Sequence, residues 1–115
     1  MEKEYNKLVR DNIPKIIEKD KEIPIIRFLS NEEYRKELYK KLLEECNEVL
    51  EAQNSEERIE ELSDVLEIIK SIAELEGQSL EKVLETANNK RLKKGGFQKR
   101  IFLEKTILKT QNDKK

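Results

Sequence analysis

Two long amphipathic stretches, separated by one short polar break, constrain this chain more than any other feature. Ser30 followed by Glu33 forms a capping-box pattern and predicts a helix that continues to about Gln53. Asn54-Ser55 interrupts the pattern and supplies the N-cap of a second helix, which Gly77 ends. Because so short a break leaves room only for a reversal of direction, we expect the two helices to pack antiparallel.

Apolar residues recur at helical spacing along both stretches and predict the faces that pack together. On the first helix they are Tyr34, Leu38, Leu42, Cys46, Val49 and Leu50. On the second they are Ile59, Leu62, Val65, Leu66, Ile69, Ile72 and Ala73. Cys46 lies within the first stripe and is therefore predicted to be a core residue.

Weaker signals surround this pair of helices. Ser79 predicts the cap of a third helix, stopped by Gly95-Gly96, with Leu80, Val83, Leu84 and Ala87 directed inward. Asn12 before Ile13-Pro14 predicts a short helix over 13–19, and Ile23 to Phe28 reads as an edge strand or an extended segment. The apolar run Ile101-Phe102-Leu103 is expected to pack back onto the helices.

These signals predict an all-α fold, an antiparallel helical bundle within a single domain. Its parts are an N-terminal arm with a short helix (1–30), a three-helix core (31–94) and a C-terminal tail (95–115). Only 36% of the residues are hydrophobic and 43% are charged, so one copy buries little apolar surface. We therefore expect oligomerisation to complete the core.

The lone cysteine and the hydropathy indicate the compartment. One cysteine excludes a disulfide within the chain and fits a reducing environment. No apolar run is long enough to cross a bilayer, and the N-terminus lacks the apolar core of a signal peptide. We expect a cytoplasmic protein with no membrane partner.

Charge is balanced overall but unevenly distributed. The chain has 24 Lys and Arg against 25 Asp and Glu, yet the segment 44–67 holds ten acidic residues and one basic residue. From Lys90 onward there are ten basic and two acidic residues. An acidic middle and a basic end suit a protein that holds cations in one place and phosphates in another.

Two acidic pairs with i, i+3 spacing are directed toward the predicted helix interface. At about 100° per residue, Glu45 lies at the edge of the first apolar stripe with Glu48 on the same flank. Glu61 projects into the apolar arc of the second helix, and Asp64 borders that arc. Ionised carboxylates in such positions are costly unless they are paired or bind a metal.

The residue types limit the chemistry. Oxygen ligands without any histidine suit a hard ion, Mg²⁺ or Mn²⁺, rather than zinc. A chain with no histidine also cannot build a Ser-His or Cys-His nucleophile within one subunit. Hydrolysis by a metal-activated water with a carboxylate base is the chemistry that remains.

Three motifs resemble one family. Glu44-Glu45-Cys46-Asn47-Glu48, followed by Glu61-Leu62-Ser63-Asp64, resembles the EExxE…ExxD signature of the MazG-like, all-α NTP pyrophosphatase superfamily. The segment Tyr5 to Pro14 is similar to the opening of a compact single-domain branch, in which a Gly-Gly-Phe segment like Gly95-Gly96-Phe97 follows the third helix. The resemblance covers nearly the whole chain.

The resemblance implies a function and assigns roles by position. The activity would be pyrophosphohydrolysis, NTP or dNTP plus water to NMP plus pyrophosphate, in a homodimer or homotetramer without nucleic acid. The metal ligands would be Glu45, Glu48, Glu61 and Asp64, and the candidate catalytic residues are Glu44 and Glu45. The candidate substrate-binding residues are Asn6, Lys7, Arg10, Asn88, Lys90, Arg91 and Lys94.

Two alternatives stay open. A phosphoribosyl-ATP pyrophosphohydrolase of histidine biosynthesis belongs to the same superfamily, but the Tyr5 to Pro14 segment resembles the other branch. A non-catalytic helical dimer that binds a protein or nucleic acid would explain the basic C-terminal part. It would not explain an inward Glu61.

Overall fold

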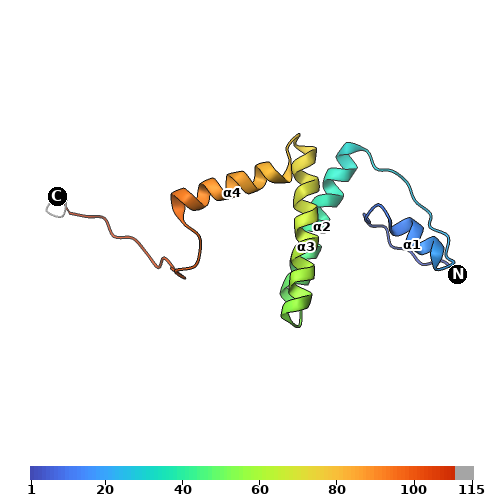
Figure 1. The fold of residues 1–115 in the computed structure, drawn as a ribbon, viewed down its shortest axis with the longest axis horizontal. Coiled ribbons are helices and arrows are strands. Elements are labelled where there is room, and N and C mark those ends of the chain that lie inside the picture. Colours follow the sequence, from blue (N-terminus) through green and yellow to red (C-terminus); the bar gives the residue numbers. More distant parts are fainter. Residues whose placement is uncertain (111–115) are drawn as a thin grey trace. The chain divides into compact units, whose positions relative to one another are not determined.

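The computed structural model describes residues 1–110, and within them it contains four α-helices and no strand (Figure 1). The helices are α1 (Ile13–Lys19), α2 (Asn31–Glu51), α3 (Ser55–Leu75) and α4 (Leu80–Lys94). The all-α prediction is confirmed. Residues 23–28 have no regular secondary structure, so the edge-strand alternative is wrong. No helix in the described part of the chain has the length and apolar character needed to cross a membrane.

Side chains at the helix ends explain why the boundaries fall where they do. The Ser30 hydroxyl accepts a hydrogen bond from the Glu33 amide, and the Glu33 carboxylate accepts one from the Ser30 amide, as predicted. Asn54, rather than Ser55, caps α3 by accepting from the Glu57 amide at 2.9 Å. Asn12 makes no side-chain capping bond, so α1 begins on the proline signal alone.

Arg58, the lone basic residue of the acidic segment, stabilises the turn between α2 and α3. Its guanidinium donates to the carbonyl oxygens of Ala52, at 2.6 Å, and Val49, at 3.3 Å. These carbonyls belong to the end of α2, where no intrahelical donor is left for them. At the other end of the pair, Arg35 of α2 forms an ion pair with Glu76 beyond α3. Both ends of the helical hairpin are therefore tied by arginines.

The packed core lies between α2 and α3, which run side by side in opposite directions (Figure 1). Leu38 of α2 is 2% exposed, and Ile68 and Ala73 of α3 are also buried. Among the described residues these three form the whole buried apolar core. Cys46 is exposed, so its assignment to the core is wrong for the single chain. One copy of this hairpin buries little, as the composition predicts.

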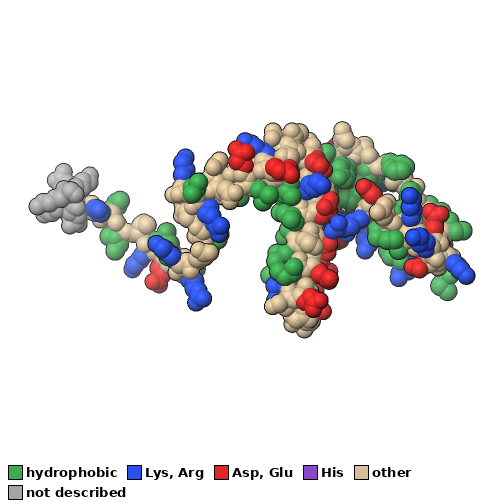
Figure 2. Space-filling view, viewed as in Figure 1, with side chains coloured by type: hydrophobic (Ala, Val, Ile, Leu, Met, Phe, Trp, Pro, Cys, Tyr) green, Lys and Arg blue, Asp and Glu red, His purple; other side chains and the backbone are tan. Residues whose placement is uncertain are grey.

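The exposed side chains of the hairpin separate by type. Figure 2 shows acidic side chains along one edge of the α2–α3 pair and apolar side chains along the other. The exposed apolar residues of the hairpin, which we call the apolar edge, are Tyr39, Leu43, Leu50, Ile59, Leu62 and Leu66. On α2 this edge lies a third of a turn or more around the helix axis from Glu45, by the roughly 100° step per residue. The hairpin therefore has an acidic edge and an apolar edge.

The contacts divide the chain into two compact units, and the second begins at Leu84, inside α4. Ser79 accepts from the Lys82 amide, and Gly95, with φ of +85°, ends the helix as predicted. No residue of α4 is buried. Most of the helix belongs to the second unit, so the inward positions of Leu80, Val83, Leu84 and Ala87 stay a prediction. The apolar run 101–103 is 74–87% exposed. It belongs to the second unit, so its packing onto the helices of the first unit stays a prediction.

Candidate metal centre

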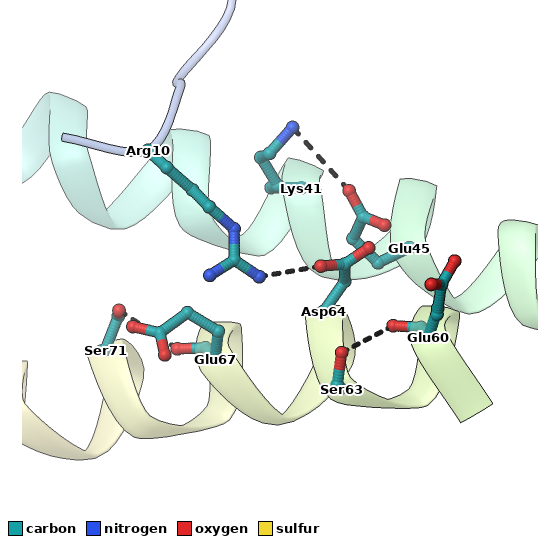
Figure 3. Close-up of polar contacts among 8 residues, drawn as sticks. All are labelled: Arg10, Lys41, Glu45, Glu60, Ser63, Asp64, Glu67 and Ser71. Atoms are coloured by element: carbon teal, nitrogen blue, oxygen red, sulfur yellow. Dashed lines mark hydrogen bonds and ion pairs between the residues drawn. The ribbon is translucent and has the colours of Figure 1, made fainter. Parts of the chain in front are cut away.

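Three carboxylates from the two packed helices converge on the acidic edge of the hairpin. Glu45 of α2 and Glu61 and Asp64 of α3 each offer an oxygen, and these three oxygens all lie within 4.8 Å of one another. All three residues are half-buried. Figure 3 shows the carboxylates of Glu45 and Asp64 directed toward each other from facing helices. We call these three residues the carboxylate cluster.

The local sequence positions each member of the cluster. Glu45 follows Leu38 by seven residues, or two turns, so its side chain leaves α2 on nearly the same side as the buried leucine. Glu61 and Asp64 precede Ile68 by seven and four residues and share its side of α3 in the same way. The carboxylates therefore leave their helices on the side of the helix interface.

The negative charges of the cluster repel one another, and a bound cation would reduce this repulsion. Desolvation raises the pKa of Glu61, and the negative charges of Glu48, Asp64, Glu45 and Glu60 raise it further. A glutamate held in this way binds a proton more tightly than a free one because its charged form lacks a partner. A divalent cation among the three carboxylates would supply that partner.

The other acidic residues of the motif lie outside the cluster. Glu48 is exposed and contributes no oxygen to the group of three, although its charge is the second cause of the raised pKa of Glu61. Glu44 is exposed and faces Lys41 at 3.8 Å. The structure thus brings together three of the four predicted metal ligands and leaves Glu48 at their side.

Two basic side chains lie against the cluster. Arg10, from the N-terminal arm, places Nη2 at 2.6 Å from Oδ1 of Asp64 (Figure 3). Lys41, one turn before Glu45 on α2, places Nζ at 3.7 Å from Oε1 of Glu45. The i, i+4 spacing of Lys41 and Glu45 is a recognised ion-pair spacing and is the sequence signal for this contact, although Lys41 was not among the predicted site residues. Arg10 and Asp64 were both predicted site residues, but their contact was not predicted.

Neighbouring hydroxyls on α3 do not serve the cluster. The Ser63 hydroxyl donates to the Glu60 carbonyl at 2.6 Å, and the Ser71 hydroxyl donates to the Glu67 carbonyl at 3.1 Å (Figure 3). Both hydroxyl protons are therefore used by the backbone of the helix. Among the described residues, Arg10 and Lys41 form ion pairs with the cluster.

The remaining N-terminal candidates lie on the arm. Asn6 is exposed and adopts a left-handed backbone conformation with φ of +46°, which Asn tolerates better than most residues. The Lys7 ammonium lies 5.8 Å from the centroid of the Tyr5 ring, a cation–π distance. Of these candidates, Arg10 is the one with an ion pair to the carboxylate cluster.

The C-terminal candidates belong to the second unit. Asn88, Lys90, Arg91 and Lys94 are all exposed on α4, and Lys90 and Lys94 line a shallow surface hollow. The Arg91 guanidinium lies against Gly96, where an added Cβ would stand 3.5 Å from Nε. At that distance an added Cβ would make an ordinary van der Waals contact, so the Arg91 side chain lies beside Gly96 without requiring a glycine there.

Comparison with known proteins gives no relative. No protein-family model matches the chain, no curated protein matches it, and no solved structure matches it. The resemblance to the MazG-like superfamily stays a prediction carried by the residues quoted above.

Proposed function

We propose that this chain is a metal-dependent nucleoside triphosphate pyrophosphohydrolase, which converts an NTP or dNTP and water to the monophosphate and pyrophosphate in a house-cleaning role. The observation that carries the proposal is the convergence of Glu45, Glu61 and Asp64 from two helices. Half-buried carboxylates, with the pKa of Glu61 raised by desolvation and by the charges around it, are costly to a structural protein. A protein that uses them to hold a cation recovers that cost.

The donor set fits magnesium. The cluster offers carboxylate oxygens alone, and the chain has no histidine and one cysteine, which is exposed away from the core. Mg²⁺ takes oxygen ligands and is commonly held by few carboxylates, keeping waters and substrate phosphates in its other positions. Mn²⁺ accepts the same ligands. Bound to these residues, the ion would neutralise phosphate charge and supply an activated water.

The chain's own residues then have separable roles. Glu45, Glu61 and Asp64 hold the ion, and exposed Glu44 or Glu48, next to them on α2, is available to accept a proton from the attacking water. Arg10 and Lys7 would bind the phosphates of the substrate, because Lys and Arg stabilise the charge that develops on a phosphoryl group. Lys90, Arg91 and Lys94 offer the same chemistry on α4, in the second unit.

We also propose that a second copy of the chain covers the apolar edge and completes an antiparallel helical bundle. The edge exposes Leu50 by 79%, Leu43 by 72% and Ile59 by 66%, which is unusual for large aliphatic residues along a continuous stripe. The carboxylate cluster lies on the other edge, so a second copy could pack there without covering the cluster. Either a homodimer or a homotetramer would satisfy this surface.

The deciding experiment measures pyrophosphate release from a panel of NTPs, dNTPs and phosphoribosyl-ATP, with Mg²⁺, with Mn²⁺ and with EDTA. Glu61→Gln should lower turnover at least about 100-fold while the helical circular dichroism is unchanged, because it removes one ligand oxygen charge. Glu74→Gln is the matched control, since Glu74 is an exposed glutamate on the same helix. Full activity of the Glu61 variant, or no turnover of any nucleotide, would refute the proposal.

A further inference from the structure

The two basic side chains at the carboxylate cluster differ in how they are held. Lys41 lies on α2 itself, with a side chain only 19% exposed, so it cannot move far from Glu45. Arg10 reaches Asp64 from a segment 54 residues earlier in the chain, and its side chain is 56% exposed. Residues 1–10 have no helix or strand of their own to fix them. Arg10 is therefore the counter-ion that can leave.

A divalent cation at the cluster would compete with Arg10 for Asp64. Both are positively charged and both would bind the same carboxylate, so the bound cation would weaken the attraction that holds the guanidinium there. The guanidinium, at 2.6 Å from the Asp64 oxygen, also occupies the space that the water shell of a cation at the cluster requires.

We propose that Arg10 is the displaceable counter-ion of Asp64, so that a divalent cation binding at the cluster expels its guanidinium and releases the N-terminal arm. The inference rests on the proposed function only in taking Asp64 as a metal ligand. It adds an order of events, in which the arm is tied down in the metal-free protein and freed in the metal-loaded protein. A freed Arg10 is then available to an anionic ligand. In the metal-free protein that ligand would first have to displace Asp64 from the guanidinium.

Trypsin cleavage reports whether the Arg10–Asp64 ion pair is broken. The protease must bind the Arg10 side chain in its own specificity pocket before it can cleave the peptide bond that follows. Cleavage under gentle conditions then follows the population in which the ion pair is broken. Exposed ion pairs bias such a population by less than about fivefold. Saturating Mg²⁺ should therefore raise cleavage after Arg10 about two- to fivefold. Cleavage after Arg27 in the same digest is the internal reference, because Arg27 pairs with Glu33, which is not a candidate ligand.

Two variants test the cause. Asp64→Asn should be cut after Arg10 as fast without Mg²⁺ as the wild-type protein is with it, and should no longer respond to the metal. Arg10→Gln should bind Mn²⁺, followed by electron paramagnetic resonance, about two- to fivefold more tightly, because the competitor is gone. Arg27→Gln removes the same charge and should leave Mn²⁺ affinity unchanged.

The outcomes separate this inference from the proposed function. If Mn²⁺ binds but Mg²⁺ leaves cleavage after Arg10 unchanged or slows it, the inference is overturned and the proposed function stands. If the metal releases the arm but no nucleotide is hydrolysed, the proposed function is overturned and the inference stands. If neither ion binds, both fail.

Discussion

The α2–α3 hairpin and helix α4 have equally clear sequence signals for helix formation but differ in how many apolar residues they bury. Capping serines precede both α2 and α4, and both helices contain apolar residues at helical spacing. The hairpin holds all the buried apolar residues of the described chain, whereas α4 holds none. Capping is local and forms a helix wherever its residues occur. Burial requires a second surface of matching shape, and α2 and α3 provide that for each other.

The largest expected effect separates the two regions by stability. Leu38→Ala should lower the free energy of unfolding by about 2–5 kcal/mol, because it leaves a cavity in the hairpin core. Leu92→Ala, at an α4 position that is 86% exposed, should change it by less than about 0.5 kcal/mol. Urea unfolding followed by circular dichroism measures both. Equal losses would show that α4 is packed in solution.

A charge on the apolar edge tests whether a second copy supplies the missing surface. Leu66→Glu should raise the dissociation constant of the oligomer about 100-fold or more, because it places an unpaired charge in an apolar interface. Glu74→Gln is the control on the same helix. Sedimentation velocity at several concentrations gives the result, and a wild-type protein that is a folded monomer at micromolar concentration would contradict the oligomer.

Removing the caps one at a time makes the comparison sharper. Ser30→Ala should cost about 1 kcal/mol of global stability, since α2 unfolds together with the hairpin core. Ser79→Ala should reduce the helical signal of α4 without moving the main transition, because α4 buries nothing. The two variants are to be compared by thermal melting. A shared shift of the main transition would mean that both regions unfold as one unit.

The smallest expected effect concerns pH and only the hairpin. The folded-state pKa of Glu61 is raised, so the unfolded chain holds fewer protons between the two pKa values. Stability of the metal-free protein should therefore fall as pH rises through the glutamate range. Glu33 has a lowered pKa, from its hydrogen bond with the Ser30 amide and the nearby Arg27, and its contribution is instead lost as pH falls.

Glu61→Gln removes the contribution of Glu61 to the pH dependence and leaves that of Glu33 in place. The variant should no longer lose stability as pH rises through the glutamate range. It should still lose stability as pH falls, because Glu33 is unchanged. Saturating Mg²⁺ should remove the same decline from the wild-type protein. Denaturant unfolding between pH 3 and pH 8 measures the slopes (values that bracket the roughly 4.3 of a free glutamate), and an unchanged slope in the variant would contradict the role of Glu61.

The sequence predicted what local interactions determine. Serine, asparagine and glycine signals placed α2, α3 and α4, and the Pro14 signal placed α1. The helical projection identified Glu61 and Asp64 as residues near the interface. The prediction failed for Cys46, because an apolar stripe indicates which side of a helix favours burial but not whether a surface is present to bury it. The Arg10–Asp64 contact joins residues 54 apart, and no spacing rule reaches that far.

The number of residues between each carboxylate and the α2–α3 connection determines whether the cluster forms. Glu45 stands nine residues before the Asn54 cap, and Glu61 and Asp64 stand seven and ten residues after it, so all three lie at the same height, about 10–15 Å from the bend. One residue inserted between Glu45 and the bend would turn its carboxylate by about 100° and dismantle the cluster. Insertions beyond the cluster, toward the end of the hairpin opposite the bend, would leave the relative positions of the three carboxylates unchanged. Across related chains, length variation should therefore be confined to that open end, while the span from Glu45 to Asp64 keeps a fixed number of residues.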